Sequence, residues 1–234
     1  MITFLVKLTI LLLLVCMIKR VYEMIQYNSN AVIVPIDYPT KDRLQTELKH
    51  KNPLLMTIQS VQPVTIHDFN LRTPGYMIQE NDSLLSLDQV SKSDSYSIHK
   101  NKSMIQDFHL TSECSPTMDM LTNIMSCDKS ISLSLYKGTH PSTLYKNYRE
   151  LLAIQCLSGT IDIYLYNPKH ELDIKGKQLQ TIKKWGMKQT LSNQQVLLIP
   201  TEWYYSIETK EESVATLYEA DTISTWLFNY LRRK

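Results

Sequence analysis

The chain has 234 residues, of which 43% are hydrophobic and 21% charged, and its formal net charge is +2. This length and composition allow one substantial hydrophobic core and a further segment outside it. Lysine and arginine are scattered rather than gathered in a stripe with interleaved aromatics, so the sequence does not favour nucleic-acid binding. With 5 glycines and no G-x-G-x-x-G pattern, the chain also lacks a glycine-rich phosphate loop, which excludes enzymes built on one.

The first 18 residues form an apolar run with one charge, Lys7, and the basic pair Lys19-Arg20 follows directly. Eighteen helical residues span about 27 Å, close to the thickness of the hydrocarbon core of a bilayer. A cleaved signal peptide would need small residues at its cleavage site, whereas those before Arg20 are large or basic. We therefore expect residues 1–20 to be a retained single-pass transmembrane anchor, with residues 1–18 in contact with the membrane. The basic pair favours a cytoplasmic location for the C-terminal domain.

Residues 21–51 form a linker that contains one short amphipathic segment. Thr40 precedes this segment, and Leu44 and Leu48 within it lie four residues apart. The pattern predicts a short helix with Thr40 as its N-cap and with the two leucines packed on the domain core.

The domain itself is expected over residues 52–234. Residues 83–115 within it are polar and predict loops with one or two short elements. A strand is expected at residues 131–136. At the end of the chain, apolar residues within 222–232 recur at helical spacing and predict a packed helix.

Two stretches between these elements predict paired strands. Residues 151–168 read LLAIQCLSGTIDIYLYNP, in which Ser158-Gly159 signals a tight turn and alternating apolar residues follow it. Residues 192–208 read SNQQVLLIPTEWYYSIE, an apolar strand closed by Pro200 and followed by an aromatic cluster. We expect the two strands of each stretch to be neighbours in one barrel.

These two stretches, in this order, resemble the cupin-like and Jumonji C (JmjC) family over residues 133–231. The resemblance implies a mainly β fold, a double-stranded β-helix (cupin or jelly-roll) with flanking short helices, here preceded by the N-terminal transmembrane helix. It also implies the chemistry of that family, in which two histidines and a carboxylate hold Fe(II) and 2-oxoglutarate is the cosubstrate.

The residues at the positions that match the functional residues of the family are changed. Leu144 and Lys146 stand where the His-x-Asp pair would fall, and Tyr205 stands where the last iron-binding histidine would be. Ile161 replaces the Lys or Arg that holds the 2-oxoglutarate carboxylate. Leucine and lysine cannot replace imidazole and carboxylate as iron ligands. We therefore expect a pseudo-enzyme with no catalytic residue, no metal ligand and no cofactor.

Aromatic residues take the place of the metal in this part of the chain. The candidates for lining a cavity or binding a partner are Tyr145, Tyr148, Tyr164, Tyr166, Trp203, Tyr204 and Tyr205. Tyrosine and tryptophan dominate binding hot spots, but the inward positions of small barrels are normally filled, which favours cavity filling. Strand alternation predicts that Trp203 turns inward and that Tyr204 points the other way, as an exposed anchor.

The sequence thus predicts a membrane-anchored, non-catalytic cupin/JmjC-like protein with a structural or protein-interaction role, of a kind that would suit a viral membrane-associated protein. Two alternatives stay open. One is an Fe(II)/2-oxoglutarate-dependent hydroxylase with displaced ligands, and the other is a small-molecule sensor that uses the barrel cavity. A remaining cavity would favour the sensor, whereas two histidines and a carboxylate converging on one point would favour the hydroxylase.

Overall fold

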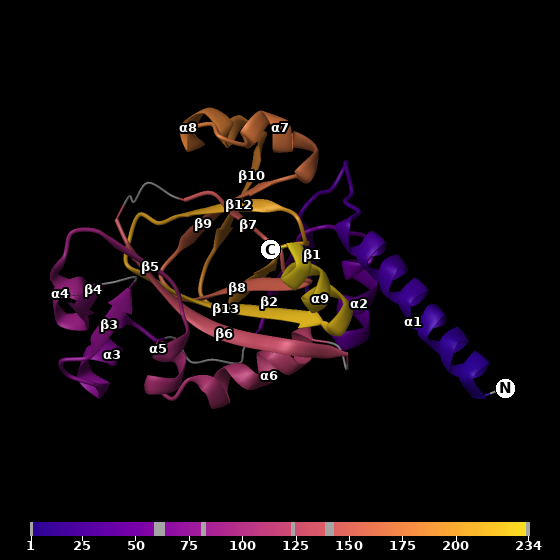
Figure 1. The fold of residues 1–234 in the computed structure, drawn as a ribbon. Coiled ribbons are helices and arrows are strands. Elements are labelled where there is room, and N and C mark those ends of the chain that lie inside the picture. The colour runs from indigo at the N-terminus through magenta and orange to yellow at the C-terminus, as the bar shows by residue number, and fades with distance from the viewer. Residues whose placement is uncertain (1, 59–63, 81–82, 123–124, 139–142, 233–234) are drawn as a thin grey trace.

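The computed structural model describes residues 2–58, 64–80, 83–122, 125–138 and 143–232 (Figure 1). It is 39% helix and 34% strand, and its described strands form several sheets that do not close into a barrel. The fold is therefore mixed α/β. The predicted mainly β double-stranded β-helix is wrong, because the described residues hold at least as much helix as strand and their sheets do not close into a barrel.

A seven-stranded sheet runs through the middle of the domain. In spatial order its strands are β1 (Val34–Ile36), β2 (Leu54–Thr57), β11 (Gln195–Leu198), β8 (Leu151–Ser158), β13 (Ser213–Thr222), β6 (Ser126–Lys137) and β5 (Tyr96–Asn101). Strands β1 and β2 are parallel, whereas the other neighbours are antiparallel. The strand expected at residues 131–136 is confirmed as part of β6.

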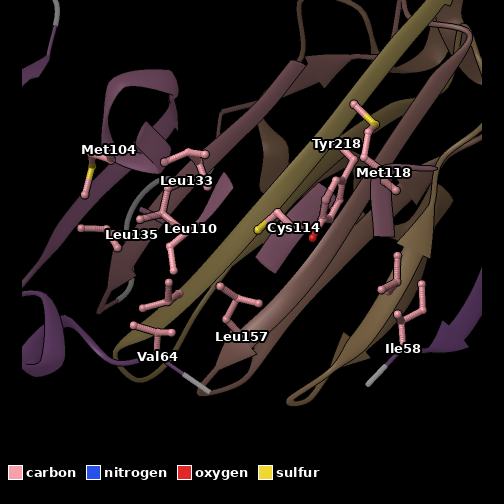
Figure 2. Packing of buried hydrophobic residues seen from close by; sticks show 14 of the residues in the cluster. Ile58, Val64, Met104, Leu110, Cys114, Met118, Leu133, Leu135, Leu157 and Tyr218 are labelled. Carbon is pink, nitrogen blue, oxygen red and sulfur yellow. The ribbon is translucent and has the colours of Figure 1, made fainter. Parts of the chain in front are cut away.

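Helices cover one face of this sheet, as Figure 1 shows. They are α2 (Lys41–Leu48), α3 (Ile66–Arg72), α4 (Leu87–Lys92), α5 (Lys102–Asp107) and α6 (Thr111–Leu121), and the small hairpin of β3 (Met77–Glu80) and β4 (Ser83–Ser86) lies beside them. Figure 2 shows Cys114 and Met118 of α6 beside Tyr218 of β13 in the core between helices and sheet. The predicted helix at 40–48 is confirmed: the Thr40 side chain accepts a hydrogen bond from the Arg43 N–H, and Leu44 is buried.

A four-stranded sheet lies over the opposite face of the seven-stranded sheet. Its order is β10 (Gly186–Leu191), β9 (Ile161–Tyr166), β12 (Tyr204–Glu208) and β7 (Tyr145–Lys146). The apolar side chains of both sheets meet in a second core, to which β8 contributes Ile154 and β9 contributes Ile163. The connection from β9 to β10 folds over the outer face of the smaller sheet as η1 (Pro168–His170), α7 (Glu171–Ile174), α8 (Leu179–Ile182) and η2 (Lys183–Trp185) (Figure 1).

The four strands expected in the two stretches exist, but their predicted pairing is wrong. Strand β8 pairs with β11 and β13, whereas β9 pairs with β10 and β12 in the other sheet. Strands β11 and β12 are likewise in different sheets. The turn after β8 passes the chain from one sheet to the other, and Gly159 makes it with φ +74 beside the Glu212 carbonyl. A Cβ at that position would lie 2.3 Å from the carbonyl oxygen.

The N-terminal helix α1 (Ile2–Ile25) projects from the domain and reaches it near α9 (Ile223–Arg232), the predicted C-terminal helix (Figure 1). Within the part of the chain that the structure describes, no helix combines the length and the apolar character that a membrane crossing requires. The helix does not end at Lys19-Arg20 but continues through them, with Lys19 paired to Glu23 and Arg20 to Glu150. The predicted transmembrane anchor, and the single-pass membrane location that depended on it, are therefore wrong.

Candidate functional site

A pocket of about 490 Å³ opens where the edge strand β7 of the smaller sheet meets β5, β12, α7 and α9. It brings together six residues that the sequence singled out, namely Leu144, Tyr145, Lys146, Tyr148, Tyr204 and Tyr205. Four further residues complete the lining, namely Lys100, Glu171, Lys175 and Arg232. We call the part around Lys100, Tyr145 and Tyr205 the Lys100 end of the pocket, and the part around Tyr148 and Arg232 the Arg232 end.

Lys146 is the central cation of the pocket. Its Nζ lies 3.3 Å from Glu171 Oε1 and 3.0 Å from Glu202 Oε2, and 4.8 Å from the centre of the Tyr204 ring. Burial alone would lower the pKa of Lys146, but the hydrogen bond and the negative charge of Glu202 outweigh it and raise that pKa above its ordinary value. Lys146 is therefore a fixed positive charge.

Glu171 is a lining carboxylate, and it is held by a tyrosine. The Tyr204 hydroxyl donates a hydrogen bond of 2.7 Å to Glu171 Oε1. This bond is the largest cause of the lowered pKa of Glu171, and the charge of Lys146 lowers it further. Burial, followed by the bond to Glu171, raises the pKa of Tyr204. At neutral pH the pair consequently consists of a carboxylate and a neutral phenol.

Arg232 brings the last turn of α9 to the pocket. Its guanidinium carbon lies 4.8 Å from the centre of the Tyr148 ring, and its Nη2 donates to Glu202 Oε2 at 3.3 Å. Glu202 thus holds both Arg232 and Lys146 from outside the lining. It does so from a turn in which its own φ is +68, a left-handed conformation that is costly for a non-glycine residue.

The Lys100 end is a buried cluster of rings with an ion pair beside it. The Tyr145 ring stacks between His99, at 4.2 Å, and Tyr205, at 5.3 Å between ring centres. His99 Nδ1 lies 2.7 Å from the Tyr136 hydroxyl, and burial lowers the pKa of His99 to about 3, so the imidazole is neutral. Lys100 Nζ lies 2.7 Å from Glu219 Oε1.

The other residues named from the sequence lie outside the pocket. Trp203 and Ile161 are fully buried in the core between the sheets, which confirms the inward direction of Trp203. Tyr166 packs in the small core under α7 and α8, and Tyr164 lies at the margin of that core with Lys183 Nζ 5.0 Å from its ring centre. Tyr204 does point to the opposite face from Trp203, but it is 8% exposed because the β9–β10 connection covers that face. The expected exposed anchor at this position is wrong.

Sequence reasoning missed the charged half of the pocket. The residues it missed lie in three separate segments, namely β5 (Lys100), α7 with its C-cap (Glu171 and Lys175) and α9 (Arg232), and only the tertiary fold brings them together. Arg232 alone had a local signal, since it belongs to the predicted C-terminal helix and a cation near a helix end is common.

Within the described ranges, no group of three or more His, Cys, Asp or Glu side chains is arranged to hold a metal ion. The predicted absence of a cofactor stays a prediction, as does the alternative of a hydroxylase with displaced ligands. Comparison of the chain with protein-family models and with curated proteins finds no match. The resemblance to the cupin-like and JmjC family therefore stays a prediction that rests on the residues quoted above.

Proposed function

We propose that the protein is a non-catalytic binding protein that takes up a small molecule in the pocket between β5, β7, β12, α7 and α9. The observation that carries this proposal is the pocket itself. Its volume of about 490 Å³ falls in the range of about 300–1,000 Å³ typical of small-molecule sites. Tyrosine rings form much of its wall, as aromatic side chains do in such sites, and charged side chains of the kind that fixes the orientation of a ligand converge on it.

The charged groups are held in place before any ligand arrives. Lys146 lies among two carboxylates and the face of Tyr204, and Arg232 lies between Glu202 and the face of Tyr148. Immobilising one long side chain on binding costs about 0.5–1.5 kcal/mol. Side chains that are already fixed avoid most of this cost, so the arrangement favours binding.

The direction of the pKa shifts supports binding rather than acid–base catalysis. A general acid or base works best with a pKa near the working pH. In this pocket the pKa of Glu171 is lowered, whereas the pKa values of Lys146, Tyr204 and Arg232 are raised. The pKa of each of these four groups is shifted further from pH 7, so none of them readily exchanges a proton at neutral pH. The structural or protein-interaction role expected from the sequence stays a prediction.

A fragment screen with a blocking variant tests this function. A library of neutral, anionic and cationic fragments is screened against the full chain by saturation-transfer NMR. Leu144→Trp places a large ring in the pocket lining, and Leu172→Trp makes the same change on α7 at a side chain that is 91% exposed and outside the lining. We expect fragments to bind the wild type and Leu172→Trp but not Leu144→Trp. Hits that bind all three proteins equally, or an absence of hits, would contradict the proposal.

A further inference from the structure

Strand β5 is interrupted at the residue that enters the pocket. It pairs regularly with β6 from Tyr96 to Ile98, and the register then shifts before Asn101 pairs with Leu133. Two residues, His99 and Lys100, therefore face one residue of β6, which is a β-bulge. Lys100 has φ +57, a left-handed conformation that is strained for a non-glycine residue. Bulges of this kind re-aim side chains, and they are frequent next to binding sites.

The bulge changes the face on which Lys100 lies. Ile98 belongs to the core beneath the helices, so regular alternation would direct Lys100, two residues later, to the same side. Lys100 instead pairs with Glu219, which lies two residues after Leu217 of the core between the sheets. The strained residue thus brings a cation to the inter-sheet face and into the pocket lining.

Tyr205 lines the same end of the pocket and carries a hydroxyl that is unpaired within the described ranges. Its side chain is fully buried, and its hydroxyl has no hydrogen-bond partner among the described residues. Burial, followed by the neighbouring ionisable groups of Tyr136, Glu219 and Tyr145, raises the pKa of Tyr205 well above its ordinary value, so the hydroxyl keeps its proton. An unsatisfied buried hydroxyl destabilises the fold, and phenylalanine at this position would avoid that destabilisation.

The charge of the lining favours a negative ligand. Among the described residues, the pocket is lined by four cations and a single carboxylate, Glu171. The cations are Lys100, Lys146, Lys175 and Arg232. The carboxylates Glu202 and Glu219, which pair with three of these cations, do not line it. The charged groups that face a ligand are therefore mainly cations, and the cluster of four cations and three carboxylates as a whole keeps a net charge of +1.

We propose that the Lys100 end of the pocket binds the oxyanion group, a carboxylate or a phosphate, of a small organic molecule. This inference rests on the proposed function and names the ligand class of that site. The Lys100 ammonium has three N–H donors, of which Glu219 takes one, and the Tyr205 hydroxyl provides a further donor. The rings of Tyr145 and Tyr148 contact the organic part of the ligand.

Four probes that share one ring and differ in the attached group test this assignment. They are benzoate, phenyl phosphate, benzyl alcohol and benzylamine, each titrated into the full chain with saturation-transfer NMR. We expect benzoate or phenyl phosphate to bind at least tenfold more tightly than the neutral and cationic probes, and the tighter of the two identifies the oxyanion. Hydrogen bonds to charged groups are worth about 1.5–3 kcal/mol, so Tyr205→Phe should weaken anion binding about tenfold or more.

Three variants distinguish a loss of ligand binding from a loss of folding. Tyr205→Phe removes a hydroxyl without a described partner, so its melting temperature should equal or exceed that of the wild type. Tyr166→Phe makes the same change at a buried tyrosine outside the lining and should leave anion binding unchanged. The double variant Lys100→Met/Glu219→Gln removes the cation without leaving a buried carboxylate unpaired, and it should also lose anion binding.

Two results would overturn the inference. One is binding of benzyl alcohol or benzylamine as tightly as the anions, and the other is anion binding that Tyr205→Phe changes by less than twofold. If neutral or cationic fragments bind and Leu144→Trp abolishes their binding while no anion binds, the ligand class is wrong and the proposed function stands. If Leu144→Trp affects no probe or fragment, both fail.

Discussion

Trp203 tests how much the core between the two sheets contributes to the stability of the fold. Its side chain is completely buried in that core, one residue before β12 begins. A tryptophan buries about 150–250 Å², which at about 25 cal/mol per Å² corresponds to about 4–6 kcal/mol of transfer free energy. The indole N–H has no hydrogen-bond partner among the described residues, so truncation also relieves an unsatisfied donor. We therefore expect Trp203→Ala to lower the free energy of unfolding by about 3 kcal/mol, the low end for such substitutions.

Trp226 provides the matched control for this measurement. It is 46% exposed on α9 and stacks on Tyr230 at 5.9 Å. Because alanine also favours a helix, we expect Trp226→Ala to change the free energy of unfolding by no more than about 1 kcal/mol. Equilibrium urea denaturation followed by far-UV circular dichroism compares the two without relying on tryptophan fluorescence. A loss in Trp203→Ala no larger than in Trp226→Ala would refute the assignment of Trp203 to the core.

Three further predictions concern the turn, the pocket and the base of α9. Gly159→Ala should lower the free energy of unfolding by about 2–4 kcal/mol, because its Cβ would meet the Glu212 carbonyl. Gly75→Ala, at φ +75 with open space around it, should lower it by about 1 kcal/mol, and equal urea midpoints for the two variants would contradict this. The lowered pKa of Glu171 stabilises the fold above about pH 4 and loses this effect as pH falls through the folded-state pKa. Glu171→Gln should therefore be less stable than wild type at pH 7, by a margin that shrinks as the pH falls below about 4, and a pH-independent difference in melting temperature would count against it. Asp221→Asn should lower the free energy of unfolding by about 3 kcal/mol, because it breaks the 2.6 Å ion pair of a fully buried carboxylate with Arg149. Asp88→Asn, in an exposed ion pair, should lower it by less than about 0.5 kcal/mol, and similar losses in the two variants would exclude a buried pair.

Local signals in the sequence were enough to place five of the strands, β6, β8, β9, β11 and β12, and the capped helix. The alternation of Ile161, Ile163 and Leu165 predicted β9, and the run closed by Pro200 predicted β11. Thr40 predicted the start of α2 because a threonine side chain at an N-cap satisfies a free backbone N–H. Each of these signals depends on residues a few positions apart, which is why each of them could be read without the fold.

The share of helix was underestimated because polar residues that begin helices were interpreted as loop. Ser86 begins α4 with a capping box, and Asn101 caps α5 by accepting from the Met104 N–H. Both helices are 6 residues long, too short to show a clear apolar period. The sequence of β8 indicated that helices or a second sheet cover both of its faces. Seven of its residues in a row are buried, and a strand without polar alternation is covered on both faces.

The pocket depends on contacts that no local pattern encodes. Alternation along β5 places Lys100 under the helices with Ile98, and only the pairing of β5 with β6 reveals the bulge that moves it to the inter-sheet face. The bulge is held by the Ser134 hydroxyl, which accepts from the Lys100 N–H at 2.9 Å, and by the ion pair with Glu219, more than a hundred residues away in the chain. Places where local rules fail are expected to be strained or functional sites. Lys100 breaks both strand alternation and the preference against positive φ, and its position in the pocket wall is the structural feature that accounts for both departures.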